Sequence, residues 1–283
     1  MNKFYGIEYG RGCLRVAAEG GPALATAEIK KMFPDADWTV VTAEPFNAEE
    51  CANDRFGENF KIQTEIYKNT PTDRHILIGG DHSVNFGHFS ALADQIPDQD
   101  LCLIYIDAHF DIHTPDSAIR EASGAPHGTN VRALLGKGDA RWLSLQQKCP
   151  ALKPENIFFL GVRSFEPAEA HFVLSNGIYV RSPKQLRRPE DWQKVVHEIK
   201  ELIGDKPYVI SFDFDSIDPY VFQEVLVPAY NGISVDAAKH FISAFKDKAY
   251  SIEFVEYAPR DDRQAAQIVH DLIGIAADAQ DGE

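Results

Sequence analysis

The stretch "KPYVISFDFDSIDP", residues 206–219, places three aspartates directly after a run of apolar and β-branched residues. Such a run is typical of a strand in the middle of a parallel sheet, where both faces are buried. Carboxylates buried close together repel one another, and each is costly to keep charged unless a cation compensates it. Asp213, Asp215 and Asp218 therefore predict a bound cation where this strand ends.

The spacing of these aspartates separates their roles. In an extended backbone, Asp213 and Asp215 share one face of the strand, and Phe212 and Phe214 take the other. An aspartate can also cap a helix or shape a turn. That alternative suits Asp218, which directly precedes a proline, and we expect it to shape the loop.

A second apolar run ends in the same way. The segment "LIYIDAHFDIHT", residues 103–114, carries a carboxylate or an imidazole at every second position, namely Asp107, His109, Asp111 and His113. If the strand stays extended, these four side chains point to one side. A solvated strand end is the alternative. Open α/β sheets place their active sites at the carboxyl ends of strands, so four alternating ligand types favour a metal site.

A third strand end contributes less on its own. In "ILIGGDHSVNFG", residues 76–87, the two glycines allow a tight turn, and Asp81, His82 and Ser83 then open a helix. Such a string alone is also consistent with a simple helix cap. It gains functional weight because it joins two other acidic strand ends.

Strand-like and helix-like runs alternate along the chain, which predicts βαβ units and an α/β fold. The strand-like runs are 4–10, 38–44, 75–80, 101–109, 157–163, 177–182, 208–215 and 250–259. The amphipathic runs between them include 22–33, 47–68, 189–203, 234–246 and 261–278. We expect one domain over residues 1–283, with a parallel sheet of about eight strands covered by helices on both faces. A closed (β/α)₈ barrel is the rival, and it usually needs a more regular repeat.

Charge and composition narrow the function classes. The formal charge of −15 argues against nucleic acid and anionic membranes as partners, because both need clustered lysine and arginine. No apolar run approaches the roughly 20 residues that span a bilayer, and the first residues lack the pattern of a signal peptide. No CxxC pair occurs among Cys13, Cys51, Cys102 and Cys149. We expect a soluble, reduced, cytoplasmic protein.

The ligand set indicates which metal the site prefers. Carboxylates with a few imidazoles and no cysteine suit Mn²⁺, with zinc, cobalt, nickel or iron as alternatives. The number of carboxylates exceeds what one ion requires. We therefore expect two ions, roughly 3.5–4 Å apart, held by bridging aspartates and able to supply hydroxide near neutral pH.

With these motifs in this order, the sequence resembles the ureohydrolase family, which includes arginase and agmatinase. The resemblance covers nearly the whole chain and rests on "GRGCLRVAAEGGPALA" (10–25), "GGDHS" (79–83), "DAHFD" (107–111), "SFDFDSIDP" (211–219) and "VEYAPRDD" (255–262). It implies a three-layer α/β/α fold and a binuclear manganese hydrolase that releases urea from a guanidinium group. It also implies a homo-oligomer, a trimer or a hexamer.

The resemblance assigns a role to each metal ligand. One Mn²⁺ is expected on His82, Asp107, Asp111 and Asp213, and the other on Asp107, His109, Asp213 and Asp215, so that two aspartates bridge. The implied catalytic residues are His127, which would shuttle protons, Glu256, which would pair with the substrate guanidinium, and Asp111. Without the family, His127 is consistent with a loop histidine capping a carbonyl, and Glu256 with a solvated strand end.

The substrate is less clearly specified. By resemblance, His113 and Ser123 face the carboxylate of an amino-acid substrate, and Glu166 and Glu169 face its α-amino group. Family members carry asparagine where this chain has His113 and Ala125, and "HGTNVR" (127–132) is closer to agmatinases or formiminoglutamases. The segment "YVFQEVLVPAYNGIS" (220–234) replaces the glycine- and threonine-rich loop that shapes the substrate pocket in the family.

The resulting prediction is hydrolysis of L-arginine, or of a close guanidino amino acid, to urea and an amine such as ornithine. Agmatinase, guanidinobutyrase and formimidoylglutamase activities are the alternatives. A zinc amide deacetylase shares the fold but uses one metal and fewer carboxylates, and a non-catalytic scaffold usually loses ligands. The full set of six ligands argues against both. The expected partner is therefore a small guanidino molecule.

Overall fold

The computed structural model describes residues 3–13, 21–45, 49 and 54–278. All eight of its strands pair in one parallel sheet, in the order β2-β1-β3-β8-β7-β4-β5-β6. The strands are β1 (Lys3–Glu8), β2 (Asp37–Thr42), β3 (His75–Ile78), β4 (Cys102–Ile106), β5 (Ile157–Leu160), β6 (Tyr179–Arg181), β7 (Tyr208–Asp213) and β8 (Ser251–Val255). The predicted parallel sheet is confirmed, and it is open, with β2 and β6 at its edges.

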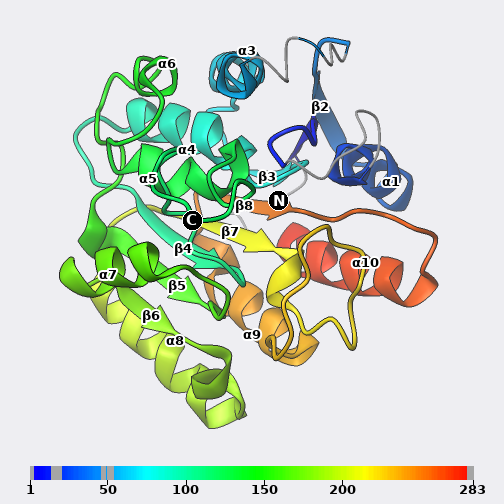
Figure 1. The fold of residues 1–283 in the computed structure, drawn as a ribbon. Helices are drawn as coiled ribbons and strands as arrows, with labels where there is room; N and C mark the ends of the chain where they lie inside the picture. The colour runs from blue at the N-terminus through cyan, green and yellow to red at the C-terminus, as the bar shows by residue number, and fades with distance from the viewer. Residues whose placement is uncertain (1–2, 14–20, 46–48, 50–53, 279–283) are drawn as a thin grey trace.

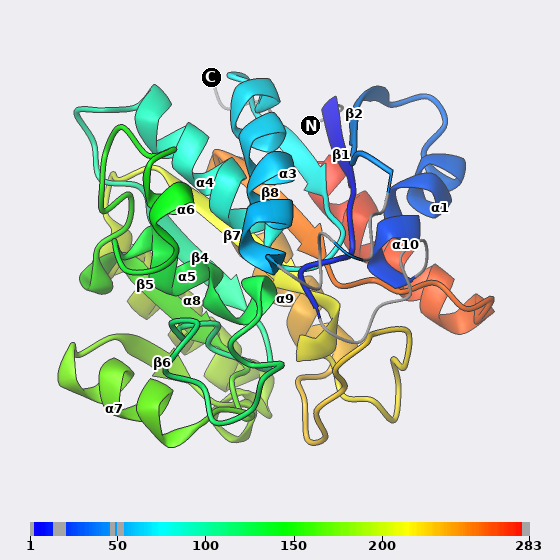
Figure 2. The ribbon, with the colours of Figure 1, turned by 45° about the horizontal axis from the view of Figure 1, so that its top comes forward.

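Helices cover both faces of the sheet, as Figures 1 and 2 show from two directions. One face carries α1 (Ala25–Met32), α8 (Pro189–Ile203), α9 (Val235–Phe245) and α10 (Arg263–Ala277). The other carries α3 (Arg55–Asn69), α4 (Val84–Gln95), α5 (Asn130–Leu134), α6 (Ala140–Leu143) and α7 (Pro167–Ser175). Short 3₁₀ turns span Gly21–Leu24, Pro126–Thr129, Pro154–Asn156, Pro183–Leu186, Phe214–Ser216 and Lys246–Lys248. The expected three layers are therefore present.

The strands alternate between the two cores. In β4, Cys102, Ile104 and Ile106 pack with the helices of one face, whereas Leu103 and Tyr105 pack with those of the other. Because both faces are covered, a central strand buries every side chain, and its sequence is apolar throughout rather than alternating. This explains why the core strands were recognisable as short apolar runs.

The crossover connections between the parallel strands all have the same handedness. Those that move toward the β2 edge carry α1, α8 and α9 on one face, and those that move toward the β6 edge carry α3 to α7 on the other. This is the constant crossover hand of parallel sheets. As a result, the carboxyl ends of β3, β8, β7, β4 and β5 lie next to one another, although their segments are far apart in the sequence.

The predicted boundaries hold best where local signals are strong. The amphipathic run 189–203 coincides with α8, which has a proline at its first position and Gly204 with φ +60° after its last. The run 47–68 corresponds to α3, which begins only at Arg55; residues 46–48 and 50–53 lie outside the described residues, as do residues 14–20 of the glycine-rich stretch.

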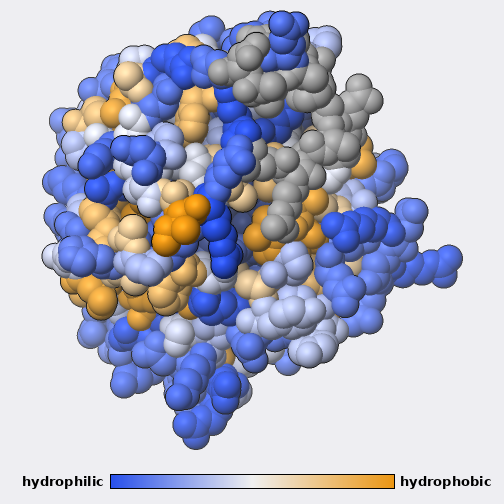
Figure 3. All heavy atoms as spheres, in the orientation of Figure 1, coloured by the Kyte–Doolittle hydropathy of each residue, from blue (hydrophilic) through white to orange (hydrophobic). Residues whose placement is uncertain are grey.

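The surface agrees with the acidic, polar composition. Figure 3 shows hydrophilic residues over much of one face, with hydrophobic patches among them. Within the described residues, no helix combines the length and the apolar character that a membrane crossing requires.

Helix α8 offers a test of the core packing. Ile199 is fully buried against the sheet, whereas Glu201 faces solvent. Ile199→Ala should lower the free energy of unfolding by about 2–5 kcal/mol through lost burial and a residual cavity. Urea denaturation followed by circular dichroism measures this. Glu201→Ala is the matched control and should change stability by no more than about 0.5 kcal/mol; equal effects of the two variants would contradict the packing described.

Candidate metal centre

Six side chains converge where three neighbouring strands end, and we call this set the metal centre. His82 comes from the turn between β3 and α4, and the others follow β4, end β7 or lie in the 3₁₀ turn after β7. The members are His82, Asp107, His109, Asp111, Asp213 and Asp215. All are buried except His109, whose side chain is 22% exposed. The six residues expected to hold metal thus lie together.

The first group of ligands surrounds the Nδ1 atom of His82. This nitrogen lies 2.9 Å from Asp107 Oδ2 and 3.6 Å from Asp111 Oδ2. Asp213 Oδ2 approaches the same nitrogen at 3.1 Å. Ligand atoms of His82, Asp107 and Asp111 all lie within 4.8 Å of one another, which is close enough to hold one ion.

The second group shares Asp107 with the first. His109 Nδ1 lies 3.0 Å from Asp215 Oδ2 and 3.4 Å from Asp107 Oδ1. Asp107, His109 and Asp215 also place their ligand atoms within 4.8 Å of one another. Asp107 therefore presents one oxygen to each group, as a bridging carboxylate does. The expected bridging role of Asp213 stays a prediction, because Asp213 lies beside His82 in the first group.

The route by which these ligands meet differs from the prediction. Strand β4 ends at Ile106, so residues 107–113 do not form an extended face, and Asp111 adopts φ +53°. His113 does not join the metal centre. Its Nδ1 lies 3.2 Å from Ser117 Oγ and its Nε2 lies 3.2 Å from Glu169 Oε2. The idea that four alternating residues share one strand face is therefore wrong.

A similar correction applies to β7. Asp213 is its last residue, and Asp215 lies in the 3₁₀ turn that follows, where its N–H donates to Asp213 Oδ1 at 2.7 Å. The turn, rather than strand alternation, brings the second carboxylate beside the first. Asp218 shapes the next loop as expected, because its carboxylate accepts the N–H groups of Tyr220 and Gly232 at 3.0 and 2.9 Å.

Three polar side chains support the ligands and were missed from the sequence. The Tyr105 hydroxyl donates to Asp111 Oδ2 at 2.8 Å, and Asn130 Nδ2 donates to the same oxygen at 3.1 Å. Ser211 Oγ lies 2.9 Å from His82 Nε2. Partners of this kind fix the orientation and tautomer of metal ligands. A polar residue inside an otherwise apolar strand was the available signal for Tyr105 and Ser211.

Burial and crowding shift the pKa values of the carboxylates in the metal centre. Burial raises the pKa of Asp111 to about 7, and the neighbouring charge of Asp107 adds to the effect. Burial and the charge of Asp215 hold the pKa of Asp213 well above its usual range. Burial opposes charge on Asp107 too, but the neighbouring imidazoles of His109 and His82 lower its pKa. Burial therefore disfavours the charged form of these carboxylates, and a bound cation would offset that cost.

The ligand geometry fits a metal better than it fits hydrogen bonding. Asp107 Oδ2 is buried and lies 2.9 Å from His82 Nδ1, yet it is not aligned to accept a hydrogen bond. Donor atoms that approach one another without mutual alignment are expected when they face a common ion. The mixture of carboxylates and imidazoles is also a set that divalent transition metals accept.

Glu256 lies beside the metal centre and is held in a strained conformation. It follows β8 with φ +63°, and its Oε1 accepts the His82 N–H at 2.8 Å. Its Oε2 is buried without a hydrogen-bond partner among the described residues. Burial, reinforced by the charge of Asp81, raises the pKa of this carboxyl. An unpaired buried carboxylate oxygen suits a ligand that brings a cation with N–H donors.

His127 is fixed through the N-terminal loop. Its Nδ1 and its backbone N–H lie 3.0 and 3.3 Å from the Gly12 carbonyl oxygen, and the Gly12 N–H donates to Asp81 Oδ2 at 2.8 Å. Burial lowers the pKa of His127 to about 4, so the ring is neutral near pH 7. Since Nδ1 donates to the carbonyl, the network assigns the free lone pair to Nε2.

A cavity of about 250 Å³ opens above these residues. The predicted substrate contacts His113, Ser123, Glu166 and Glu169 all line it, together with His127 and Glu256. Glu166 is already engaged, because it accepts the N–H groups of Ile119 and Arg120 at 2.6 and 3.2 Å. These backbone bonds lower its pKa although burial opposes them. The structure thus brings the predicted contacts together at one cavity.

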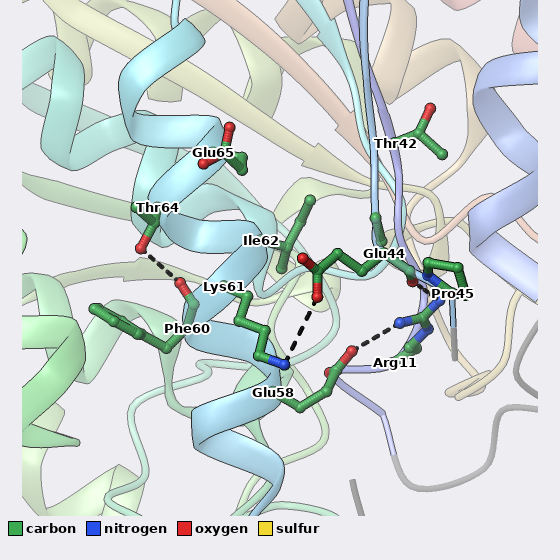
Figure 4. Close-up of a pocket in the computed structure, with 11 residues that line it drawn as sticks. Arg11, Thr42, Glu44, Pro45, Glu58, Phe60, Lys61, Ile62, Thr64 and Glu65 are labelled. Atoms are coloured by element: carbon green, nitrogen blue, oxygen red, sulfur yellow. Dashed lines mark hydrogen bonds and ion pairs between the residues drawn. The ribbon is translucent and has the colours of Figure 1, made fainter. Parts of the chain in front are cut away.

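A second hollow, of about 360 Å³, lies beside α3 and the end of β2, and its lining is shown in Figure 4. Four of its charged groups pair with one another. Arg11 Nη1 donates to Glu58 Oε1 at 2.8 Å, and Lys61 lies 3.7 Å from Glu44. Among the described residues, this hollow contains neither of the two ligand groups. The acidic cavity at the strand ends is therefore the candidate active site.

An open α/β/α sheet with paired carboxylate and imidazole ligands at its carboxyl edge is the arrangement of a metal-dependent hydrolase. Comparison with known proteins makes this more specific. The profile of the Arginase family matches residues 6–276. An arginase of Bacillus subtilis (strain 168) is 27% identical over 290 residues, which cover 95% of this chain and 96% of that protein.

Solved structures show the same fold. Entamoeba histolytica arginase in complex with L-ornithine superposes with a TM-score of 0.83, at 21% identity and with 97% of each chain covered. Formimidoylglutamase of Bacillus subtilis gives 0.72, at 16% identity, covering 99% of this chain and 88% of the other. The chain belongs to the Arginase family, and it is a hydrolase of the ureohydrolase type. Proteins of this family depend on a binuclear metal centre.

The shared position of Asp107 gives a test of the metal centre. Loss of a residue that only hydrogen-bonds to a metal ligand already lowers metal affinity by about 10–100-fold. Asp107→Asn removes a ligand from both groups and should release both ions, whereas Asp215→Asn should release one. Elemental analysis after gel filtration of manganese-loaded protein measures the content. Asp218→Asn, outside both groups, is the control and should keep two ions. Two ions in Asp107→Asn would contradict the bridging geometry.

Proposed function

We propose that this chain is a single-domain, binuclear manganese ureohydrolase that cleaves L-arginine, or a close guanidino amino acid, to urea and ornithine or the matching amine. The observation that carries the proposal is the pair of ligand groups joined at Asp107, next to the unpaired Glu256 Oε2. The pair supplies the hydrolytic site, and the carboxylate oxygen supplies a partner for a guanidinium.

Each ligand group keeps the assignment that the resemblance gave. His82, Asp107, Asp111 and Asp213 would hold one Mn²⁺, and Asp107, His109, Asp213 and Asp215 the other. At such a site two divalent cations lower the pKa of water, so that a nucleophile is available near neutral pH. Oxygen-rich ligation favours manganese over softer metals.

The remaining catalytic roles fall to Glu256 and His127. Glu256 would orient the substrate through paired hydrogen bonds to the guanidinium, and its second oxygen is free for this task. His127 would move a proton to the departing amine. The proposal is supported by its neutral ring, by its place on the cavity and by the Gly12 contact that fixes its tautomer.

The substrate end distant from the guanidinium would face the outer part of the cavity. There, Glu166 and Glu169 would attract the α-amino group, and Ser123 and His113 would lie near the carboxylate. The negative potential of two carboxylates favours an ammonium group. The bound L-ornithine of the Entamoeba enzyme supports an amino-acid substrate.

A second candidate is agmatinase, guanidinobutyrase or formimidoylglutamase activity. The observation that favours it is the loop 220–234, whose Val227 lines the cavity. This segment replaces the family's usual pocket loop, and formimidoylglutamase shares the fold. We also propose a homo-oligomer, a trimer or hexamer, by family resemblance.

A panel of substrates tests the proposed function. Manganese-loaded protein should release urea from L-arginine faster than from agmatine or 4-guanidinobutanoate, and chelation should abolish the release until Mn²⁺ is restored. Colorimetric urea detection measures the first reactions, and formamide detection measures hydrolysis of formiminoglutamate.

Each outcome of this panel has a clear meaning. Faster urea release from agmatine or 4-guanidinobutanoate than from L-arginine, or formamide release without urea, would assign the second candidate. Absence of both products from fully loaded protein would contradict hydrolysis at this site.

His127 gives a separate test of proton transfer. His127→Asn removes the ring but does not touch either ligand group, so metal content should stay unchanged. A lost general acid or base typically lowers kcat by about 10²–10⁴-fold. Steady-state urea release, with elemental analysis in parallel, measures both effects. Unchanged kcat would remove His127 from the mechanism.

A further inference from the structure

The walls of the active-site cavity are strongly acidic, so its few cationic side chains are the candidates for binding an anionic group of the substrate. Among the described lining residues, six are carboxylates, namely Asp111, Glu166, Glu169, Asp213, Asp215 and Glu256. Two guanidinium groups, Arg120 and Arg163, are also present. A guanidino acid brings a carboxylate of its own, and an anion entering such a cavity needs a positive partner.

Arg163 is fully committed to the protein backbone. Its Nη2 donates to the carbonyl oxygens of Asp215 and Ala229 at 2.8 and 2.6 Å, and its Nη1 to those of Gly161 and Ser216 at 3.0 and 3.1 Å. Its Nε also donates to the Ala229 carbonyl, at 3.2 Å. Nε and Nη2 thus hold the loop 220–234, Nη1 and Nη2 hold the turn after β7, and no nitrogen is left for a substrate.

Arg120 differs from Arg163 in its exposure and in its contacts. It is exposed at the cavity, and its guanidinium makes no hydrogen bond or ion pair with the part of the chain that the structure describes. Its backbone is fixed, because its N–H donates to Glu166 Oε1 at 3.2 Å and its carbonyl accepts from Ser123 at 3.0 Å. The adjacent acid, Glu121, lies near Arg55 at 3.8 Å instead.

The other donors near Arg120 lie beside groups of the protein itself. The His113 ring lies between Ser117 and Glu169, 3.2 Å from each. The Ser123 hydroxyl interacts with the Glu166 carboxylate and lowers its pKa. Ala125 is buried and its side chain carries no donor. At this end of the cavity, the guanidinium of Arg120 is therefore the cation available to an anionic group of a ligand. The backbone of Arg120 is held in place beside Glu166.

We propose that Arg120 binds the carboxylate of the guanidino-acid substrate and selects such acids over decarboxylated guanidines. The inference rests on the proposed function and deepens it. Guanidinium and carboxylate match as a planar pair with two parallel hydrogen bonds. Arg120 and the acids Glu166 and Glu169 then place opposite charges side by side, which is the charge pattern of a zwitterionic amino acid.

The test compares L-arginine with agmatine, which lacks only the carboxylate. For manganese-loaded wild type and Arg120→Gln, KM for each compound is measured by urea release, with an inhibition constant for agmatine if it is not hydrolysed. Charge-assisted hydrogen bonds predict a rise of about 10–100-fold for L-arginine in Arg120→Gln. The value for agmatine should stay within about twofold, since it has no group for Arg120 to bind.

Two further variants make the result specific. Arg120→Lys keeps the charge without the planar fork and should recover part of the affinity for L-arginine. Arg188→Gln makes the same change of charge at an exposed position outside the cavity lining and should behave as wild type. An equal rise for both compounds in Arg120→Gln, or no rise for L-arginine, would overturn the assignment.

The proposed function and this inference fail in different ways. If wild type releases no urea from any guanidine, the proposed function is wrong. L-Arginine is then not consumed, so calorimetric titration measures its binding to wild type and to Arg120→Gln directly. Weaker binding to the variant would still support the carboxylate contact, and equal or absent binding would overturn it.

Discussion

The carboxylates of Asp107, Asp111, Asp213 and Asp215 are buried side by side where β4 and β7 end. Four negative charges in such a place are unstable without compensation. Burial and neighbouring charges accordingly raise the pKa values of Asp111 and Asp213. Two divalent cations carry four positive charges and match the four carboxylates. The ligand groups joined at Asp107 provide two places for them.

The architecture explains how the carboxylates come to share one place. Right-handed connections move the chain along the sheet in both directions, so the ends of β3, β8, β7, β4 and β5 become neighbours. The same edge then receives Glu256 after β8 and the glutamates after β5. Residues outside the ligand set hold this region in place: the Gly12 carbonyl lies beside the His127 ring, and Arg163 donates to the loop 220–234.

The sequence predicted the sheet well because both faces are covered. Apolar runs such as that before Asp107 mark core strands, and a proline and a glycine delimit α8. The sequence predicted less about the site's local geometry. Alternation after Ile106 suggested a continued strand, but the chain leaves the extended conformation there, and His113 turns toward Glu169 rather than the metal centre. The positive φ of Asp111 depends on the tertiary structure around it, and the spacing of residue types along the chain carries no information about that.

The central claim is that one carboxylate joins two ions in this cavity, and diffraction at the manganese absorption edge tests it most directly. Crystals of the manganese-loaded protein should show two anomalous peaks per chain, about 3.5–4 Å apart, with Asp107 between them. A single peak, or a pair of peaks away from Asp107, would contradict the account.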